Sequence, residues 1–144
     1  MIRDSYHTID LPAKGEYKEK GSKFIAYSFP LNVDTELEGI LESIKNEHPK
    51  ARHYCYAYRI GTDMNKFRTN DDGEPSGTAG KPILGQIQSF NITNVLVVVV
   101  RYFGGTKLGA SGLISAYKSA TKEALDNSSV IEKYITATYL LHFN

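Results

Sequence analysis

The sequence contains little of what would place the protein outside the cell or in a membrane. Its single cysteine, Cys55, cannot form an internal disulfide, which favours a reducing compartment. The first ten residues, MIRDSYHTID, lack the apolar core of a signal peptide, and the apolar run at 95–100 is too short to span a bilayer. We therefore expect a cytoplasmic protein that makes no membrane contact.

The chain also lacks a strong net charge of either sign. Its formal net charge is +1, so no global field draws the protein to nucleic acid, and any nucleic-acid surface must be a local patch. Hydrophobic residues make up 41% and charged residues 23% of the chain, which argues against intrinsic disorder. A length of 144 residues is enough for one ordinary domain with its own core.

The longest apolar run is the one at 95–100, a β-branched stretch with a single leucine. It is too short for a typical helix, and its lack of alternation predicts a strand that is covered on both faces, at the centre of a sheet. Apolar residues at helical spacing over 113–124 predict an amphipathic helix. Between the two lie four glycines within nine residues, namely Gly104, Gly105, Gly109 and Gly112.

This glycine-rich turn before a helix predicts a site for an anion. Glycine lets a ligand approach the backbone, and a helix start offers free N–H groups and partial positive charge. Arg101, Lys107 and Lys118 add full charges. The alternative is a tight turn that binds nothing. The turn is not a nucleotide-binding P-loop, because Ala110 stands where that motif requires lysine, so we expect no NTP hydrolysis.

A second strand is expected at 51–61, where polar and apolar residues alternate. His53 and Cys55 share one face of this strand and resemble a nucleophile with its base. Strand rise separates such side chains by roughly 7 Å, too far for a direct hydrogen bond. We therefore favour a packed cysteine beside a histidine at the edge of a site.

The stretch 68–82 is rich in Gly, Pro, Asn and Ser, which predicts a long irregular loop, and such loops are often functional. Asp71, Asp72 and Glu74 carry oxygen ligands suited to Mg²⁺ or Ca²⁺, but the EF-hand spacing is not met. The alternatives are aspartates that form turns, or carboxylates paired with Arg68 and Arg101. We predict no metal site and no cofactor.

The remaining elements are read from the same patterns. A helix is expected at 35–47, ending before Pro49 and packing on a sheet face, and a short helix at 83–90. A turn is expected at 12–15. Further strands are expected at 6–11, 16–19, 23–29 and 134–143.

Four motifs together resemble the YigZ/IMPACT family over residues 21–125: GSKFIAY at 21–27, HYCYAYRIG at 53–61, NDDGEPSGTAGKPIL at 70–84 and RYFGGTKLGASGLISAY at 101–117. The resemblance implies an α+β fold like domain 2 of ribosomal protein S5. That fold is a two-layer sandwich, with a mixed or antiparallel sheet of about four to six strands and two main helices on one face.

Bacterial members of the family usually continue into a small ferredoxin-like domain. We therefore expect residues 1–128 to form the N-terminal domain, and residues 129–144 to form a linker and the first strand of a truncated second domain. The chain would then be a piece of a longer protein, and the intact mass of the natural product should exceed 16.0 kDa.

The resemblance also implies a role in translation control, which favours a binding module over an enzyme. The expected partner is the ribosome, structured RNA or a translation-control protein, with no DNA sequence specificity. Phosphate contacts are assigned to Arg59, Arg68, Lys81, Arg101, Lys107 and the backbone of Gly104, Gly105 and Gly109, with Tyr102 and Phe103 stacking on bases. The acidic signature loop comprises Asn70, Asp71, Asp72, Glu74 and Ser76, with His53 at the edge of the site.

Two other interpretations remain open from the sequence. In the first, three carboxylates act across from three basic side chains as the acids, bases and charge stabilisers of a hydrolase or phosphoester-processing enzyme, although no nucleophile–base pair is visible. The carboxylates are Asp71, Asp72 and Glu74, and the basic side chains are Arg101, Lys107 and His53. In the second, the acidic loop is a contact for a protein partner. The sequence does not indicate an oligomeric state.

Overall fold

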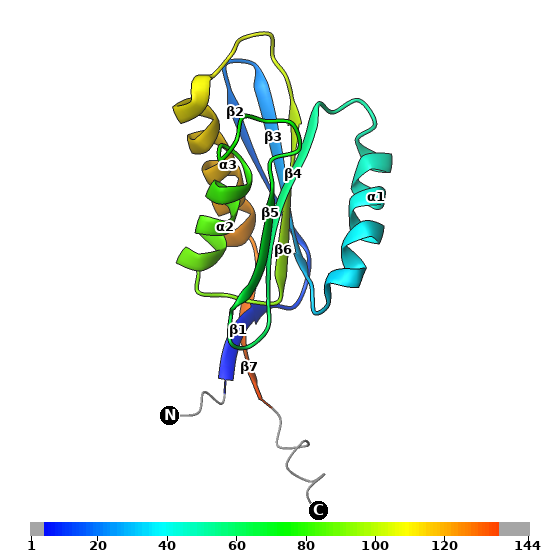
Figure 1. The fold of residues 1–144 in the computed structure, drawn as a ribbon, viewed down its shortest axis with the longest axis vertical. Helices are drawn as coiled ribbons and strands as arrows, with labels where there is room; N and C mark the ends of the chain where they lie inside the picture. The colour runs from blue at the N-terminus through cyan, green and yellow to red at the C-terminus, as the bar shows by residue number, and fades with distance from the viewer. Residues whose placement is uncertain (1–4, 136–144) are drawn as a thin grey trace, which may run out of the picture.

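The structure, a computed structural model, describes residues 5–135, which form an α+β domain (Figure 1). The main sheet has five strands in the order β2-β3-β6-β4-β5, and all neighbours are antiparallel. The α+β class and the antiparallel sheet implied by the resemblance are thus confirmed. The strands are β2 (Ala13–Glu19), β3 (Ser22–Pro30), β4 (His53–Ile60), β5 (Lys66–Asn70) and β6 (Val95–Tyr102).

Strand β6 is the middle strand of the sheet, as its uninterrupted apolar sequence predicts. Every residue at 95–100 has an exposed fraction of 0%. Alternation sends these side chains into two separate clusters. Val95, Val97 and Val99 join one cluster, whereas Leu96, Val98 and Val100 join the other.

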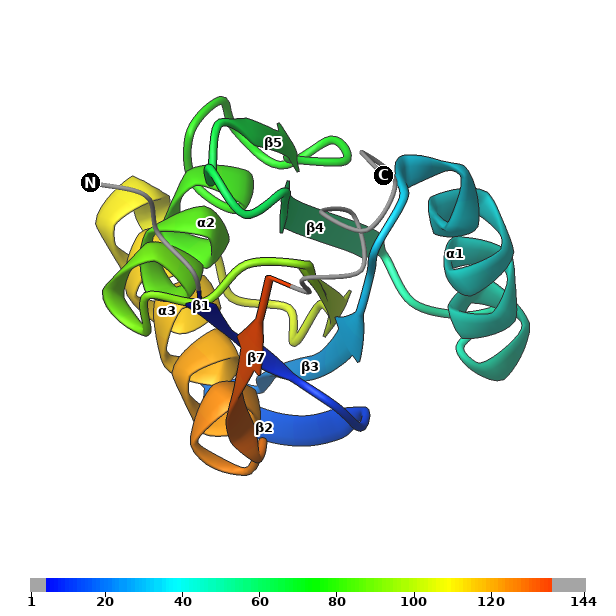
Figure 2. The ribbon, with the colours of Figure 1, turned by 90° about the horizontal axis from the view of Figure 1, so that it is seen from below.

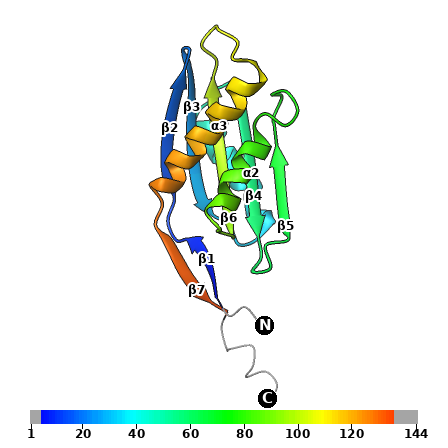
Figure 3. The ribbon, with the colours of Figure 1, turned by 90° about the vertical axis from the view of Figure 1, so that its left-hand side faces the viewer.

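Helices cover both faces of the sheet (Figure 2). Helices α2 (Gly80–Ser89) and α3 (Gly109–Asp126) lie together on one face, as expected (Figure 3). Helix α1 (Leu37–Glu47) lies on the other face and adds a third layer that the two-layer expectation omits. The reason is that the apolar stripe of α1 buries the even-numbered side chains of β6. Within residues 5–135, no helix is long and apolar enough to cross a membrane.

The polar stretch 68–82 contains more regular structure than the sequence predicts. Its first residues complete β5, an edge strand whose side chains are mostly exposed and therefore show no apolar pattern. Its last residues begin α2, with Pro82 in the first turn, where a missing N–H breaks no helical hydrogen bond. Only residues 71–79 form the loop. Similarly, β2 begins at Ala13, within the residues expected to form a turn.

A small second sheet lies at one end of the domain (Figures 1 and 2). Strand β7 (Val130–Tyr134) pairs antiparallel with β1 (Ser5–Ile9), although it falls in the stretch assigned to the linker of a second domain. Most of the strand expected at 134–143 lies outside the described residues. The proposed domain boundary at residue 128 therefore stays a prediction.

At the opposite end, the β6–α3 loop packs directly on the β2–β3 turn. A Cβ atom added to Gly104 would lie 2.1 Å from the carbonyl carbon of Gly21 and 2.4 Å from the amide nitrogen of Ser22. Both neighbours are backbone atoms, so they cannot rotate away as a side chain can. Glycine at position 104 therefore fixes the glycine-rich loop against the hairpin.

We predict that Gly104→Ala destabilises the domain by roughly 1–3 kcal/mol, because the added methyl group overlaps backbone. The matched control is Gly85→Ala in α2, where an added Cβ meets nothing within 4 Å. That control should stabilise the domain by about 0.5–1 kcal/mol, because alanine favours a helix interior. Urea unfolding measures both, and an unchanged midpoint for Gly104→Ala would contradict the packing described above.

Candidate functional site

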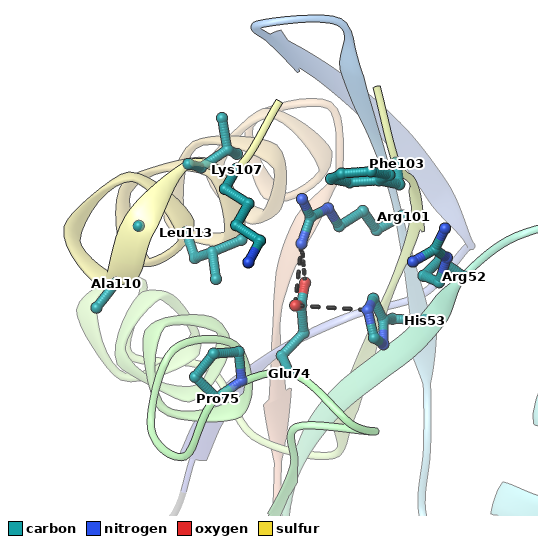
Figure 4. Close-up of a pocket in the computed structure, with 11 residues that line it drawn as sticks. Arg52, His53, Glu74, Pro75, Arg101, Phe103, Lys107, Ala110 and Leu113 are labelled. Carbon is teal, nitrogen blue, oxygen red and sulfur yellow. Dashed lines mark hydrogen bonds and ion pairs between the residues drawn. The ribbon is translucent and has the colours of Figure 1, made fainter. Parts of the chain in front are cut away.

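A cavity of about 370 Å³ lies at the end of the sheet where β4 begins and β6 ends (Figure 4). Its walls come from the start of β4, the loop at 71–79, the end of β6 and the first turns of α3. The two signature loops identified from the sequence therefore lie side by side, as expected. The lining residues are Arg52, His53, Glu74, Pro75, Arg101, Phe103, Lys107, Leu108, Gly109, Ala110 and Leu113.

Arg101 forms the centre of this site. It follows the valine run of β6 on the face that α2 and α3 cover, and it pairs with Phe24 on β3 and His53 on β4. Its guanidinium lies 5.4 Å from the ring centre of Phe24 and 5.6 Å from that of Phe103. Arg101 is only 5% exposed, so its charge must be balanced inside the protein.

Glu74 supplies that balance. Nη1 of Arg101 donates hydrogen bonds to Oε1 of Glu74 at 2.9 Å and to Oε2 at 2.7 Å. The hydroxyl of Tyr117 on α3 donates to Oε2 at 2.5 Å, and Nε2 of His53 lies 3.5 Å from Oε1. Glu74 is 8% exposed, so this carboxylate is buried and engaged by three elements of the fold.

Cys55 lies beside this network in the core, as expected of a packed cysteine. Its thiol is 3.1 Å from the carbonyl oxygen of Asp71 and 3.3 Å from the hydroxyl of Tyr117. Burial is the main cause that raises the pKa of both the Cys55 thiol and the Tyr117 hydroxyl. Both groups therefore stay protonated near neutral pH, and Cys55 is not an activated nucleophile.

His53 connects the network to the rest of the 71–79 loop. Its Nδ1 lies 2.7 Å from the carbonyl oxygen of Asp72, and because a carbonyl only accepts, Nδ1 is the donor. The carboxylate of Asp72 accepts a hydrogen bond from the backbone N–H of Tyr54 at 2.7 Å. The start of β4 therefore holds this loop through both a side chain and the backbone.

The carboxylate of Asp71 lies at the start of α2. It accepts hydrogen bonds from the backbone N–H groups of Gly77, Ala79 and Gly80, at 2.9, 3.1 and 2.8 Å. Burial alone would raise the pKa of this carboxyl, but these three bonds, with Lys81 nearby, outweigh burial and lower it. Asp71 and Asp72 thus act as turn-forming residues, one of the two alternatives to metal binding.

The second alternative, an ion pair, applies to Glu74. Of Arg68 and Arg101, only Arg101 forms an ion pair with Glu74 among the described residues. Within the described range 5–135, no group of three or more His, Cys, Asp or Glu residues is arranged to hold a metal ion.

The start of α3 differs from the start of α2. No side chain caps it, and its first turn contains no acidic residue. Its backbone N–H groups therefore have neither an intrahelical partner nor a carboxylate supplied by their own turn. Arg52 and Lys107, both exposed, add charge beside it, and the Arg52 guanidinium lies 4.9 Å from the Phe103 ring centre. This arrangement is suited to an anion.

Of the residues expected to contact phosphate, Arg101, Lys107 and Gly109 line the cavity, and Gly104 and Gly105 lie in the adjoining loop. The structure places the others elsewhere. Tyr102 faces α1, where its hydroxyl lies 2.5 Å from Nδ1 of His48, because it follows Arg101 on an alternating strand. It is therefore not positioned to stack on a base at the cavity.

Arg59 lies at the far end of β4, opposite Val95, with Nη2 only 2.6 Å from Sδ of Met64. Arg68 lies on β5 over the ring of Tyr56, at 5.8 Å, on the side of the sheet that α1 covers. Arg59 is therefore separated from the cavity by the length of β4, and Arg68 by the side of the sheet that it faces. The sequence prediction took neither strand direction nor alternation into account for these two residues.

The remaining signature residues support the loop. Lys81 lies in the first turn of α2, near Asp71, and outside the cavity lining. Asn70 accepts a hydrogen bond from the backbone N–H of Asp72 at 2.7 Å, whereas Ser76 is exposed. Sequence reasoning missed Arg52, although its place next to His53 in the chain was a signal that it lies at the same edge.

We predict that Glu74→Ala destabilises the domain by about 3–5 kcal/mol, because it leaves the buried charge of Arg101 without its carboxylate. The matched control is the double variant Glu74→Ala/Arg101→Met, which removes both charges and should recover part of the loss. Urea unfolding measures the free energies. Equal losses in the single and double variants would show that the ion pair is not the cause.

We predict that Asp71→Asn makes stability less sensitive to acid. Because folding lowers the pKa of Asp71, its carboxylate contributes stability above the ordinary value of 3.8, and that contribution is lost as the pH falls below it. The variant should be less stable than wild type at neutral pH and should lose less on acidification. Urea unfolding at several pH values tests this, with Asp10→Asn, an exposed turn residue, as the control that keeps the wild-type slope.

Comparison with known proteins gives matches over most of the chain. Residues 20–125 match a family model described as the Impact N-terminal domain. The chain is 40% identical over 129 residues to IMPACT family member YvyE of Bacillus subtilis (strain 168), covering 90% of this chain and 59% of that protein. It is 38% identical over 124 residues to IMPACT family member YigZ of Escherichia coli (strain K12), covering 85% of this chain and 61% of that protein.

A solved structure, described as the crystal structure of an hypothetical protein, superimposes with a TM-score of 0.88 at 35% sequence identity. The match covers 92% of this chain and 66% of that chain. The chain spans about three fifths of the length of the two curated relatives. It therefore belongs to the IMPACT family, and its Impact N-terminal domain, residues 20–125, contains every wall of the cavity.

Proposed function

We propose that this domain is a cytoplasmic, translation-associated binding module that contacts phosphate groups of ribosomal or other structured RNA. The observation that carries the proposal is the uncapped start of α3, which opens into a cavity beside Arg52 and Lys107. Free N–H groups and nearby cations are the features that bind phosphate in proteins. The link to translation comes from the resemblance to the IMPACT family.

The cation excess of the cavity supports a polyanionic partner. Three cationic side chains line it, Arg52, Arg101 and Lys107, against one carboxylate, Glu74, which Arg101 already neutralises. Phe103 is 39% exposed at the rim and offers an aromatic ring to an unstacked base. Phosphate contact with aromatic stacking is typical of proteins that bind single-stranded RNA.

The acidic loop has a supporting role in this proposal. The carboxylates of Asp71, Asp72 and Glu74 all accept hydrogen bonds within the domain. A protein partner that recognised them would have to compete with these bonds. The carboxylates of the loop therefore shape the cavity and are not themselves the groups that contact the partner.

The hydrolase alternative has less support from the geometry. It needs carboxylates free to act as acid or base, whereas Asp71 and Asp72 are bonded to backbone and Glu74 to Arg101. A route through a covalent intermediate would also need a protein nucleophile, and the buried, protonated thiol of Cys55 does not supply one.

Co-sedimentation with ribosomes and with structured RNA, at low and at physiological salt, tests the proposal. Wild-type binding should weaken steeply with salt. The variant Arg52→Glu/Lys107→Glu should lose roughly tenfold or more in affinity, because it replaces two phosphate contacts with repulsion. Arg101 is left unchanged, since its loss would combine an unfolding effect with a binding effect.

The matched control is Lys45→Glu/Lys118→Glu, which makes the same change in net charge at exposed positions on α1 and α3, outside the cavity. This control should keep most of the binding. If both variants bind as wild type does, the cavity is not the contact site. If wild type binds no RNA or ribosome at low salt, the proposal fails and a protein partner becomes the better explanation.

A further inference from the structure

The cavity also indicates which phosphate it takes. We propose that it recognises a terminal phosphomonoester of a nucleotide, such as the phosphorylated end of an RNA chain, in preference to the internal phosphodiesters. This inference rests on the proposed function and names the chemical group that the same site binds.

Charge balance is the first argument. A phosphomonoester carries about −1.5 to −2 charges at pH 7, whereas a phosphodiester carries about one. The ion pair of Arg101 with Glu74 is balanced, so Arg52 and Lys107 are the two cations of the cavity lining that no carboxylate neutralises there. Together with the positive end of α3, they match a dianion better than a monoanion.

The hydrogen-bond donors give a second argument. At the start of α2, the carboxylate of Asp71 accepts the backbone hydrogen bonds that a bound anion would otherwise accept. At the start of α3, no side chain caps the helix and its first turn contains no acidic residue, and a Cβ added to Gly109 would meet nothing within 4 Å, so the space beside this first residue is open. A phosphomonoester has three terminal oxygens, which suit several converging N–H donors.

The wall of the same cavity contains a residue with a buried hydrogen-bond donor. Arg101 is 5% exposed and lines the cavity, yet its Nε has no hydrogen-bond partner among the described residues. Its Nη2 reaches only Ser22, at 3.4 Å. The side chain of Lys107 extends toward Arg101 and Glu74 across the cavity (Figure 4). The arginine thus has donor capacity beyond its bonds to Glu74.

Apolar walls distinguish a nucleotide from inorganic phosphate. Pro75, Phe103, Leu108 and Leu113 line the same cavity as the cations. A phosphate ion alone would gain nothing from these side chains, whereas a ribose and base attached to the phosphate would bury apolar surface against them. The volume of about 370 Å³ is in the range of small-molecule sites.

Fluorescence anisotropy with one short, internally labelled RNA tests the proposal on the whole chain. The RNA is prepared with a 5′-phosphate, with a 3′-phosphate, and with hydroxyl groups at both ends. We expect a phosphorylated form to bind roughly tenfold more tightly than the hydroxyl form. A free nucleoside monophosphate, added as competitor, shows whether the monoester is recognised alone or only on an RNA chain.

Two variants test whether the preference for phosphorylated RNA arises at the cavity. Lys107→Ala should reduce binding of the phosphorylated RNA to the level of the hydroxyl form. Ala110→Asp should do the same while keeping or raising the melting temperature, because the new carboxylate occupies the open helix start. Loss of binding without loss of stability cannot be explained by misfolding. Lys118→Ala, an exposed position on the same helix, is the control that keeps the preference.

The outcomes separate this inference from the proposed function. Equal affinity for phosphorylated and hydroxyl RNA, with binding still weakened by Arg52→Glu/Lys107→Glu, overturns the terminal-phosphate inference and leaves RNA binding in place. A phosphate preference that persists in Ala110→Asp also overturns it, because the phosphate then lies elsewhere. Failure of wild type to bind any form overturns both.

Discussion

The buried charge of Arg101 is the constraint around which this end of the domain is arranged. A guanidinium at the end of the central strand, only 5% exposed, requires a carboxylate, and the chain supplies Glu74 from a loop that otherwise contains little apolar surface. The hydroxyl of Tyr117 and the imidazole of His53 join the same carboxylate. The carboxylate of Glu74 therefore ties the acidic loop to β4, β6 and α3, and it sets the shape of the cavity between them.

The two helices on that face show what this arrangement leaves open. Both begin at the same end of the sheet, and both follow glycine-rich turns. The carboxylate of Asp71 accepts hydrogen bonds from the N–H groups at the start of α2, so these donors already have a partner within the chain. The start of α3 has no side-chain cap, and the nearby carboxylate of Glu74 is engaged by Arg101. The asymmetry follows from where the acidic loop places its carboxylates, and it leaves the start of α3 without a carboxylate partner of its own.

The sequence predicts the parts of this picture that depend on local pattern. The apolar run at 95–100 identifies the central strand, and the glycines before α3 identify the loop that lines the cavity. Patterns do not reveal which strand end a residue occupies once the sheet is assembled. Arg59 and His53 lie on one strand, yet at opposite ends of the sheet, and Tyr102 faces away from its neighbour Arg101. Edge strand β5 was missed because an exposed strand has no apolar alternation to detect.

The division between buried and exposed charges gives the site a useful separation of roles. Arg101 and Glu74 are buried, and their mutual attraction maintains the geometry, so their substitution affects folding before it affects binding. Arg52 and Lys107 are exposed and contribute little to stability, because solvent screens their charges. Their position beside the uncapped start of α3 makes them the charges that, in the proposed function, contact phosphate. The scaffold of the site and its contact surface are therefore built from different residues, and each can be altered without the other.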